Sequence, residues 1–174
     1  MNDILSQIKT GLEGKLINAP LSEDEVFAFE TEHEISPPID YRDFLLKVGD
    51  GGDGPPEYGL LKLGEIRKNH VPDYLSEGYQ GRLKQPFPFT ESWVWEGEED
   101  LKGFEDKLKS TQFGCLVLGT DGCGMFWLLI ITGECRGQIW QTSDVGLQPC
   151  LPNHTFTQWY KNWLEGNTDW WSGY

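Results

Sequence analysis

The chain contains 174 residues with 28 acidic and 14 basic side chains, which gives a formal net charge of −14 at neutral pH. This charge argues against direct binding to nucleic acid or to an anionic membrane surface, because both depend on clusters of lysine and arginine. The length and the aromatic content (8 Trp, 9 Phe and 6 Tyr) indicate a single globular domain over residues 1–174 with a sizeable core.

Two helices are predicted before residue 35. The first covers about residues 2–17, where an apolar residue recurs every fourth position at Ile4, Ile8 and Leu12. The second begins after Ser22, because Ser22 and Glu25 have the spacing of a capping box.

A third helix is predicted to follow Pro37 and Pro38, since proline is favoured in the first helical turn. An apolar stripe with helical spacing comes next, at Tyr41, Phe44, Leu45 and Val48. Asp43 and Lys47 lie four residues apart and are expected to form an ion pair on this helix.

The acidic, glycine-rich segment 50–57 is predicted to be a loop that leads into a strand over residues 58–63. Its carboxylates raise the question of calcium. The spacing of an EF-hand loop is missing and two prolines interrupt the segment, so a tight connection is the preferred interpretation.

Residues 64–112 have the weakest pattern. Trp93–Trp95 is predicted to be a short strand. Residues 98–109 are predicted to form a helix at one edge of the sheet, because Leu101, Phe104 and Leu108 share a face.

The centre of a sheet is predicted between residues 116 and 141. Glycine-rich turns at 119–124 and 133–137 separate two apolar segments and a third, shorter one, and chain reversals are expected at these turns. Met125–Ile131 is apolar throughout, which is typical of a strand covered on both faces. We therefore expect an α+β fold in which helices cover a central sheet.

The last predicted helix begins at Thr155, which has capping-box spacing to Gln158, and it ends at Gly166. Its apolar stripe contains Phe156, Trp159, Tyr160 and Trp163. The aromatic tail, residues 169–174, is expected to fold back over the core rather than to present a patch to a partner.

No motif for catalysis, for a cofactor or for a metal is found, so a protein without enzymatic activity, cofactor or metal is expected. Cys150 and His154 are the nearest approach to a nucleophilic pair, but this acidic chain offers little positive charge to lower a thiol pKa. Asp121 lies in a glycine turn, where a structural role as acceptor of backbone N–H groups is preferred.

The cysteines fall at no metal-ligand spacing. The chain opens with no secretory signal, and its longest apolar run is well below the roughly 20 residues of a membrane-spanning helix. A cytoplasmic location with no membrane contact is therefore expected.

Two runs of carboxylates, Glu23–Glu34 and Glu91–Asp100, contain no lysine or arginine. A solvated surface explains such runs, and so does a docking surface for a cationic protein. The candidate partner-binding residues are Glu30, Glu34, Asp50, Asp53, Glu57, Glu98, Glu99 and Asp100. Glu30 has the alternative of pairing within the fold.

The order and spacing of several landmarks resemble the SUKH superfamily, which includes bacterial immunity proteins and fungal cell-wall-assembly regulators. The resemblance covers about residues 20–165. Its landmarks are Val26, Phe29 and Glu30; Pro38, Tyr41, Phe44 and Leu45; Gly51 and Gly52; Gly119–Gly122; the apolar strand that ends at Gly133; Gly137–Trp140; and Phe156, Trp159 and Trp163. The region of about residues 64–112 contains none of these landmarks and is expected to be a divergent insertion.

This resemblance implies an α+β domain with a mixed or antiparallel sheet of about five to six strands flanked by helices. It also implies a protein that acts by binding, because most bacterial members resemble antidotes to toxins delivered between competing cells, as in polymorphic toxin systems. The expected function is that of an immunity protein that neutralises a cognate toxin with a basic surface, a nuclease being one class that fits. The alternative is a regulatory protein-interaction scaffold of the cell-wall-regulator type.

Overall fold

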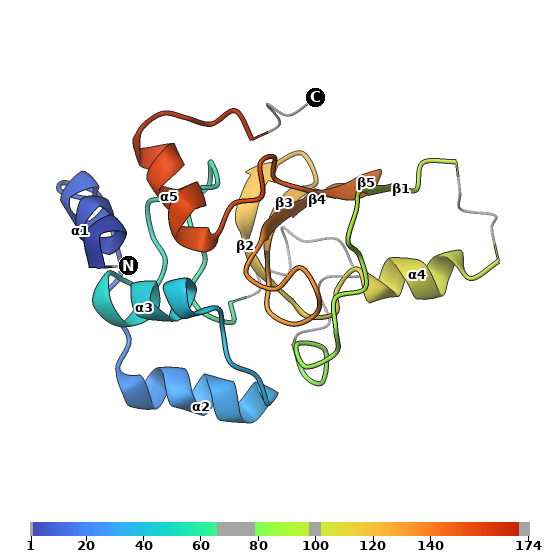
Figure 1. Cartoon of the computed structure of the whole chain (residues 1–174), viewed down its shortest axis with the longest axis horizontal. Coiled ribbons are helices and arrows are strands. Elements are labelled where there is room, and N and C mark those ends of the chain that lie inside the picture. Colours follow the sequence, from blue (N-terminus) through green and yellow to red (C-terminus); the bar gives the residue numbers. More distant parts are fainter. Residues whose placement is uncertain (1, 66–78, 98–101, 171–174) are drawn as a thin grey trace.

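A five-stranded antiparallel sheet forms the centre of the computed structural model, which describes residues 2–65, 79–97 and 102–170 (Figure 1). The strand order is β1-β5-β4-β3-β2. The strands are β1 (Trp93–Val94), β2 (Cys115–Gly122), β3 (Met125–Ile130), β4 (Ile139–Thr142) and β5 (Gly146–Pro149). The α+β class is confirmed. No feature of the sequence predicts strand β5, because its four residues carry no clear apolar alternation.

The helices are α1 (Asn2–Gly11), α2 (Glu23–His33), α3 (Ile39–Lys47), α4 (Phe104–Ser110) and α5 (Phe156–Leu164). Both predicted capping boxes are present, at Ser22 with Glu25 and at Thr155 with Gln158. Helix α1 ends six residues earlier than predicted, because Gly11 and Gly14 favour the turn that follows it. The expected start of α4 at residues 98–101 lies outside the described residues.

Both faces of the sheet are covered, as the continuous apolar pattern of β3 predicted. One core cluster contains Leu116, Leu118, Trp127, Leu129 and Ile131, together with buried residues of α1, α3 and α5. The other contains Cys115, Val117, Phe126, Leu128 and Ile130, and Phe104 and Leu108 of α4 pack against it. Neighbouring residues of a strand therefore belong to opposite cores, as the alternation of a pleated strand requires. Figure 1 shows α1, α3 and α5 on one side of the sheet and α4 on the other.

The predicted strand over residues 58–63 is present only as an isolated pairing of Gly52 with Leu60. Residues 16–18, 51–53 and 58–61 form what we call the loop ladder, a set of short extended segments beside β2. Leu61 connects this ladder to the sheet, since its N–H donates to the carbonyl of Leu118 at 2.8 Å. The contact of Leu61 with Leu118 joins residues 57 positions apart, and the pairing of Ile17 with Gly52 joins residues 35 positions apart, so local periodicity gives no sign of them.

The tail folds back over the core as far as Trp170. This side chain is buried, and its ring centroid lies 5.7 Å from that of Trp127 and 6.2 Å from that of Trp159. The N–H of Leu151 donates to the carbonyl of Trp170 at 2.8 Å. The expectation is confirmed for this residue, and residues 171–174 lie outside the described part of the chain.

Candidate protein-binding groove

A groove of about 650 Å³ opens at the loop ladder. The segment after α1, the acidic loop, the residues beside β2 and one residue of α5 form its walls. The lining residues are Lys15–Asn18, Gly52–Gly54, Glu57–Leu60, Lys62, Glu65 and Trp163. Two of the predicted contact residues, Asp53 and Glu57, therefore meet in one concave site.

Asp50 is a predicted contact residue that the structure places inside the fold, with 8% of its surface exposed. Its Oδ1 accepts a hydrogen bond from the N–H of Leu63 at 2.7 Å. Its carbonyl accepts another from the side-chain amide of Asn18 at 2.8 Å. Burial raises the pKa of the Asp50 carboxyl, because the charged form loses hydration. Asp50 thus holds the acidic loop in place and does not line the groove.

Asp53 is exposed, and hydrogen bonds to Leu16 connect it to the segment after α1. Its Oδ2 accepts from the N–H of Leu16 at 2.9 Å, and its own N–H donates to the carbonyl of Leu16 at 2.7 Å. The hydroxyl of Tyr160 donates to the Asp53 carbonyl. Burial and the nearby Asp53 charge raise the pKa of Tyr160, which keeps it a hydrogen-bond donor. The second carboxylate oxygen, Oδ1, has no hydrogen-bond partner within the described residues.

Glu57 is held by its backbone, which leaves its carboxylate available. Its N–H donates to Oδ1 of Asp121 at 2.9 Å, and Oδ2 of Asp121 accepts from the indole N–H of Trp127 at 2.6 Å. Asp121 thus has a structural role, as predicted. The donors to its carboxylate are a backbone N–H of the acidic loop and the indole of Trp127 in β3. Among the described residues, the Glu57 carboxylate has neither an ion pair nor a hydrogen bond.

Glycine lets the acidic loop come close to β2. A Cβ on Gly119 would lie 2.6 Å from the carbonyl oxygen of Gly59 and 2.7 Å from the ring of Pro56. Both distances are shorter than real contacts of that kind, so any side chain at position 119 would push the loop outwards. Gly119 therefore sets the position of one wall of the groove.

Two apolar side chains of the groove lie open to solvent. Leu16 is 81% exposed and Tyr58 is 66% exposed. Trp163 faces the same space, with the ammonium of Lys15 positioned 4.9 Å from the ring centroid in a cation–π contact. Exposed aromatic and aliphatic groups beside charged ones are the composition of a protein-binding surface.

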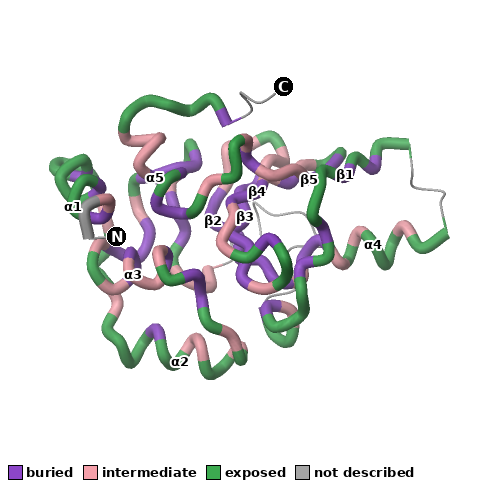
Figure 2. The backbone as a smooth tube through the Cα atoms, in the orientation of Figure 1, coloured by how far each residue is buried: buried purple, intermediate pink, exposed green. Residues whose placement is uncertain are grey.

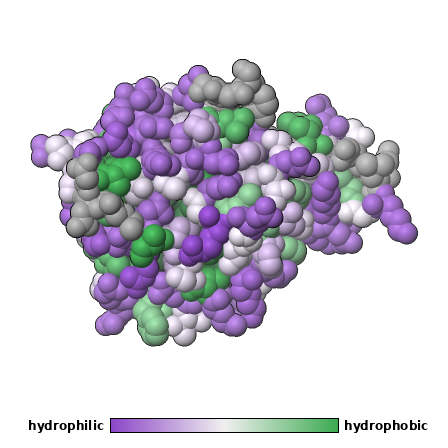
Figure 3. Space-filling model, in the orientation of Figure 1, coloured by the Kyte–Doolittle hydropathy of each residue, from purple (hydrophilic) through white to green (hydrophobic). Residues whose placement is uncertain are grey.

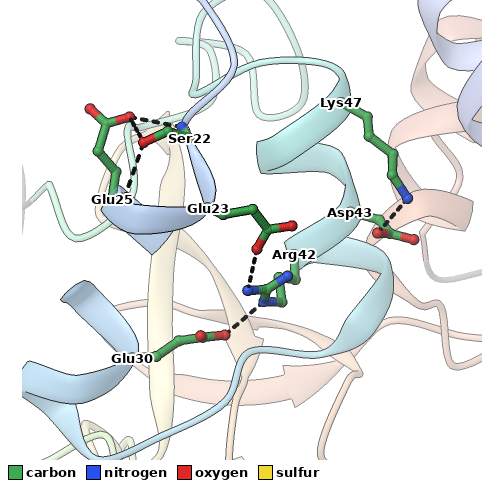
Figure 4. Close-up of polar contacts among 7 residues, drawn as sticks. All are labelled: Ser22, Glu23, Glu25, Glu30, Arg42, Asp43 and Lys47. Carbon is green, nitrogen blue, oxygen red and sulfur yellow. Dashed lines mark hydrogen bonds and ion pairs between the residues drawn. The ribbon is translucent and has the colours of Figure 1, made fainter. Parts of the chain in front are cut away.

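The acids of α2 are largely engaged within the fold (Figure 4). Arg42 of α3 donates to Glu30 at 2.9 Å and to Glu23 at 2.8 Å. The Glu30 side chain is only 14% exposed, so pairing within the fold is the alternative that the structure shows for it. Glu34 ends α2 and pairs with Lys84 at 2.8 Å. These two predicted contact residues therefore lie outside the groove.

The remaining polar contacts of this region are also local. Glu25 accepts hydrogen bonds from the N–H and hydroxyl of Ser22, each at 2.8 Å, and these bonds lower the pKa of Glu25. The predicted pair of Asp43 and Lys47 is present at 2.6 Å. The other three predicted contact residues, Glu98, Glu99 and Asp100, lie outside the described residues.

Cys150, the candidate nucleophile, is unsuited to that chemistry, and so is Cys115. Cys150 is fully buried, and burial raises the pKa of its thiol far above the usual range. Burial likewise raises the pKa of Cys115 to about 12. A raised thiol pKa keeps sulfur in the neutral form, which is a poor nucleophile.

No three His, Cys, Asp or Glu side chains gather within residues 2–65, 79–97 and 102–170 in a way that would hold a metal ion. No helix in the same described ranges combines the length and hydrophobicity that spanning a bilayer requires.

Sequence reasoning missed the apolar half of the groove. Leu16 continues the four-residue repeat of Ile4, Ile8 and Leu12, so a helix over residues 2–17 would have buried it. The helix ends at Gly11 instead, and Leu16 points outwards in the loop ladder. The glycines at 11 and 14 were the available signal.

The chain is thus an α+β protein whose sheet is covered on both faces and whose loop ladder opens into a partly apolar, partly acidic groove. Residues 20–164 match the SMI1 / KNR4 family (SUKH-1), and the chain belongs to this family. The resemblance to the SUKH superfamily is thus confirmed. Comparisons with curated proteins and with solved structures gave no match. The family is generally non-catalytic, and membership is consistent with an immunity or a regulatory role.

Proposed function

We propose that this chain is an immunity protein that acts in the cytoplasm, where it binds a cognate protein toxin and blocks it without catalysing a reaction. The groove carries the proposal. It presents carboxylate oxygens of Asp53 and Glu57, which have no partner among the described residues, beside the exposed side chains of Leu16 and Tyr58. Family membership supports an immunity role as one of two possibilities.

The charged and the apolar groups of this surface are expected to act at different stages of binding. A formal charge of −14 draws a basic partner from a distance and raises the association rate. Once in contact, the desolvated apolar groups contribute most of the affinity. Lys15 and Lys62 also line the groove, so the fitting partner surface is basic with some acidic contacts rather than uniformly cationic.

Co-expression with the product of the adjacent gene tests the proposal. We expect growth to be restored when that product is toxic, and the two proteins to elute as one complex in gel filtration. Absence of both rescue and complex would contradict the proposal. A non-toxic neighbour that still binds at the groove would favour the regulatory role instead.

A matched pair of variants assigns the effect to the groove. Glu57 and Glu32 are both exposed glutamates without an ion pair in the described residues, and only Glu57 lines the groove. We expect Glu57→Lys to weaken rescue and Glu32→Lys to leave it unchanged, with both variants folded by circular dichroism.

A further inference from the structure

The loop ladder extends the sheet beyond β2 and ends in an open edge. Gly52 and Leu60 exchange two backbone hydrogen bonds, of 2.9 and 2.8 Å. On the other side of Gly52, the N–H of Asp53 donates to the carbonyl of Leu16 at 2.7 Å, and the N–H of Asn18 donates to the carbonyl of Gly51 at 3.0 Å. Residues 16–18 are therefore the outermost segment of the ladder.

Backbone groups of this segment alternate between bonded and unbonded. Leu16 and Asn18 use their N–H and carbonyl groups towards the acidic loop. Within the described residues, Ile17 and Ala19 have no hydrogen-bond partner for either group. In an antiparallel arrangement such alternate groups point away from the neighbouring strand. Ile17 and Ala19 thus offer two donors and two acceptors at the edge, where water solvates them in the free chain.

The edge lacks the features that usually protect an open strand. Proteins commonly place lysine, proline or a charge at the middle of an exposed edge to prevent pairing. Residues 16–19 include no charged residue and no proline, and their first residue, Leu16, is 81% exposed, while the Lys15 ammonium lies over the ring of Trp163. Pro20 lies past the last unbonded N–H of the segment. The groove that holds Asp53 and Glu57 is lined by the same segment.

We propose that the partner adds an extended segment to the edge formed by residues 16–19, with basic side chains on alternate positions directed to Asp53 and Glu57. This inference rests on the proposed function and names how the toxin is held. Strand addition draws affinity from main-chain hydrogen bonds and specificity from alternate side chains. The groove that this edge lines holds carboxylate oxygens of Asp53 and Glu57 with no partner among the described residues, so a basic segment is the occupant that fits.

A synthetic heptapeptide that alternates lysine and valine, with both ends capped, tests the inference by amide exchange in nuclear magnetic resonance. We expect the peptide to slow exchange of the Ile17 and Ala19 amides about tenfold, since each gains a hydrogen bond. The control is the same peptide methylated on every backbone nitrogen, which keeps the charge and loses the donors. Equal effects of the two peptides, or protection confined to α2, would overturn the inference.

A second copy of the chain is the competing occupant of the edge. Protection of the Ile17 and Ala19 amides that rises with protein concentration alone would assign the edge to a second copy and overturn the inference. Leu16→Lys supplies an independent test, because a lysine at the edge repels a basic strand. We expect it to weaken peptide binding about tenfold. Phe27→Lys, at another exposed site, on α2 (64% exposed), should change binding less than about twofold.

The two proposals fail separately. Rescue from the toxin without protection of the edge amides would refute strand addition and leave the immunity function standing. Strand addition by the peptide without rescue would refute the immunity function alone.

Discussion

Helix α2 and the groove each contain a group of acidic residues. The two groups differ in how many of their carboxylates are paired within the fold. In α2, Glu30 and Glu23 bond to Arg42, and Glu34 bonds to Lys84. In the groove, one carboxylate oxygen of Asp53 accepts a hydrogen bond, and Glu57 has no partner for its carboxylate among the described residues. A run of acids in the sequence therefore does not show which carboxylates remain unpaired after folding. The proposed contact surface depends on such carboxylates lying in a concave, partly apolar site, and Glu32 of α2, which is also unpaired among the described residues, lies outside it.

The two regions also differ in shape. Each exposes one aromatic residue to a similar extent, Phe27 at 64% on α2 and Tyr58 at 66% in the groove. Figure 2 shows α2 as a largely exposed helix set apart from the buried strands. The face in Figure 3 is mainly hydrophilic, with small separate hydrophobic spots. A concave site excludes water around a bound side chain better than a convex helix does, so we expect Tyr58 to contribute more than Phe27 to binding a partner.

The largest expected effect is therefore on affinity. Tyr58→Ala should weaken toxin binding about 30-fold, equal to about 2 kcal/mol, because it removes a desolvated aromatic contact. Phe27→Ala is the matched control and should weaken binding less than about threefold. Isothermal titration calorimetry measures both, and the reverse ranking would move the contact surface to α2.

Arg42→Met tests whether the α2 acids serve the fold. The substitution leaves the half-buried Glu30 carboxylate without its partner, so the free energy of unfolding in urea should fall by about 1.5 kcal/mol. Lys84→Met breaks an exposed pair with Glu34 and should cost below about 0.5 kcal/mol. Equal losses for the two variants would show that burial of Glu30 is unimportant, and a loss of toxin affinity in Arg42→Met would contradict the division of roles.

Glu57→Gln should act on the rate of association. Removing one carboxylate at the contact site should slow association about threefold at low salt, and the difference should shrink as sodium chloride rises. Stopped-flow fluorescence measures the rate, and Glu32→Gln on α2 is the control with the same charge change. A rate deficit that persists at high salt would mean that Glu57 acts by direct contact rather than by steering.

Asp50→Asn should give the smallest effect, and it depends on pH. Burial raises the pKa of Asp50, so its contribution to stability is present below the pKa of the unfolded chain and is lost as pH rises through the raised pKa of the folded state. Asparagine keeps an acceptor for the N–H of Leu63 and carries no charge. The stability of the variant relative to the parent should therefore increase with pH in urea denaturation from pH 3.5 to 7. A difference that stays constant or decreases would contradict the role of burial.

Local signals in the sequence were sufficient for much of the fold. Capping boxes at Ser22 and Thr155 start their helices, and the unbroken apolar run of β3 indicates a strand between two cores. The loop ladder was not predictable in this way, because it pairs Ile17 with Gly52 and Gly52 with Leu60 across loops. Such pairings depend on tertiary contacts and leave no periodic pattern.

The candidate site was predictable in part, and for a similar reason. Asp53 and Glu57 stand out as acids in a glycine-rich loop, and the structure places both in the groove. Asp50, three residues before Asp53, looks the same in sequence, yet the backbone turns it inwards to Leu63. Whether a carboxylate is paired within the fold depends on partners elsewhere in the chain, such as Arg42, and a single sequence does not reveal these pairings.

Amide hydrogen exchange of the chain, followed with and without its toxin, tests the central claim most directly. The account predicts slower exchange over residues 15–19 and 52–60, together with unchanged exchange over residues 23–33. Protection confined to residues 23–33, with none at the groove, would contradict it.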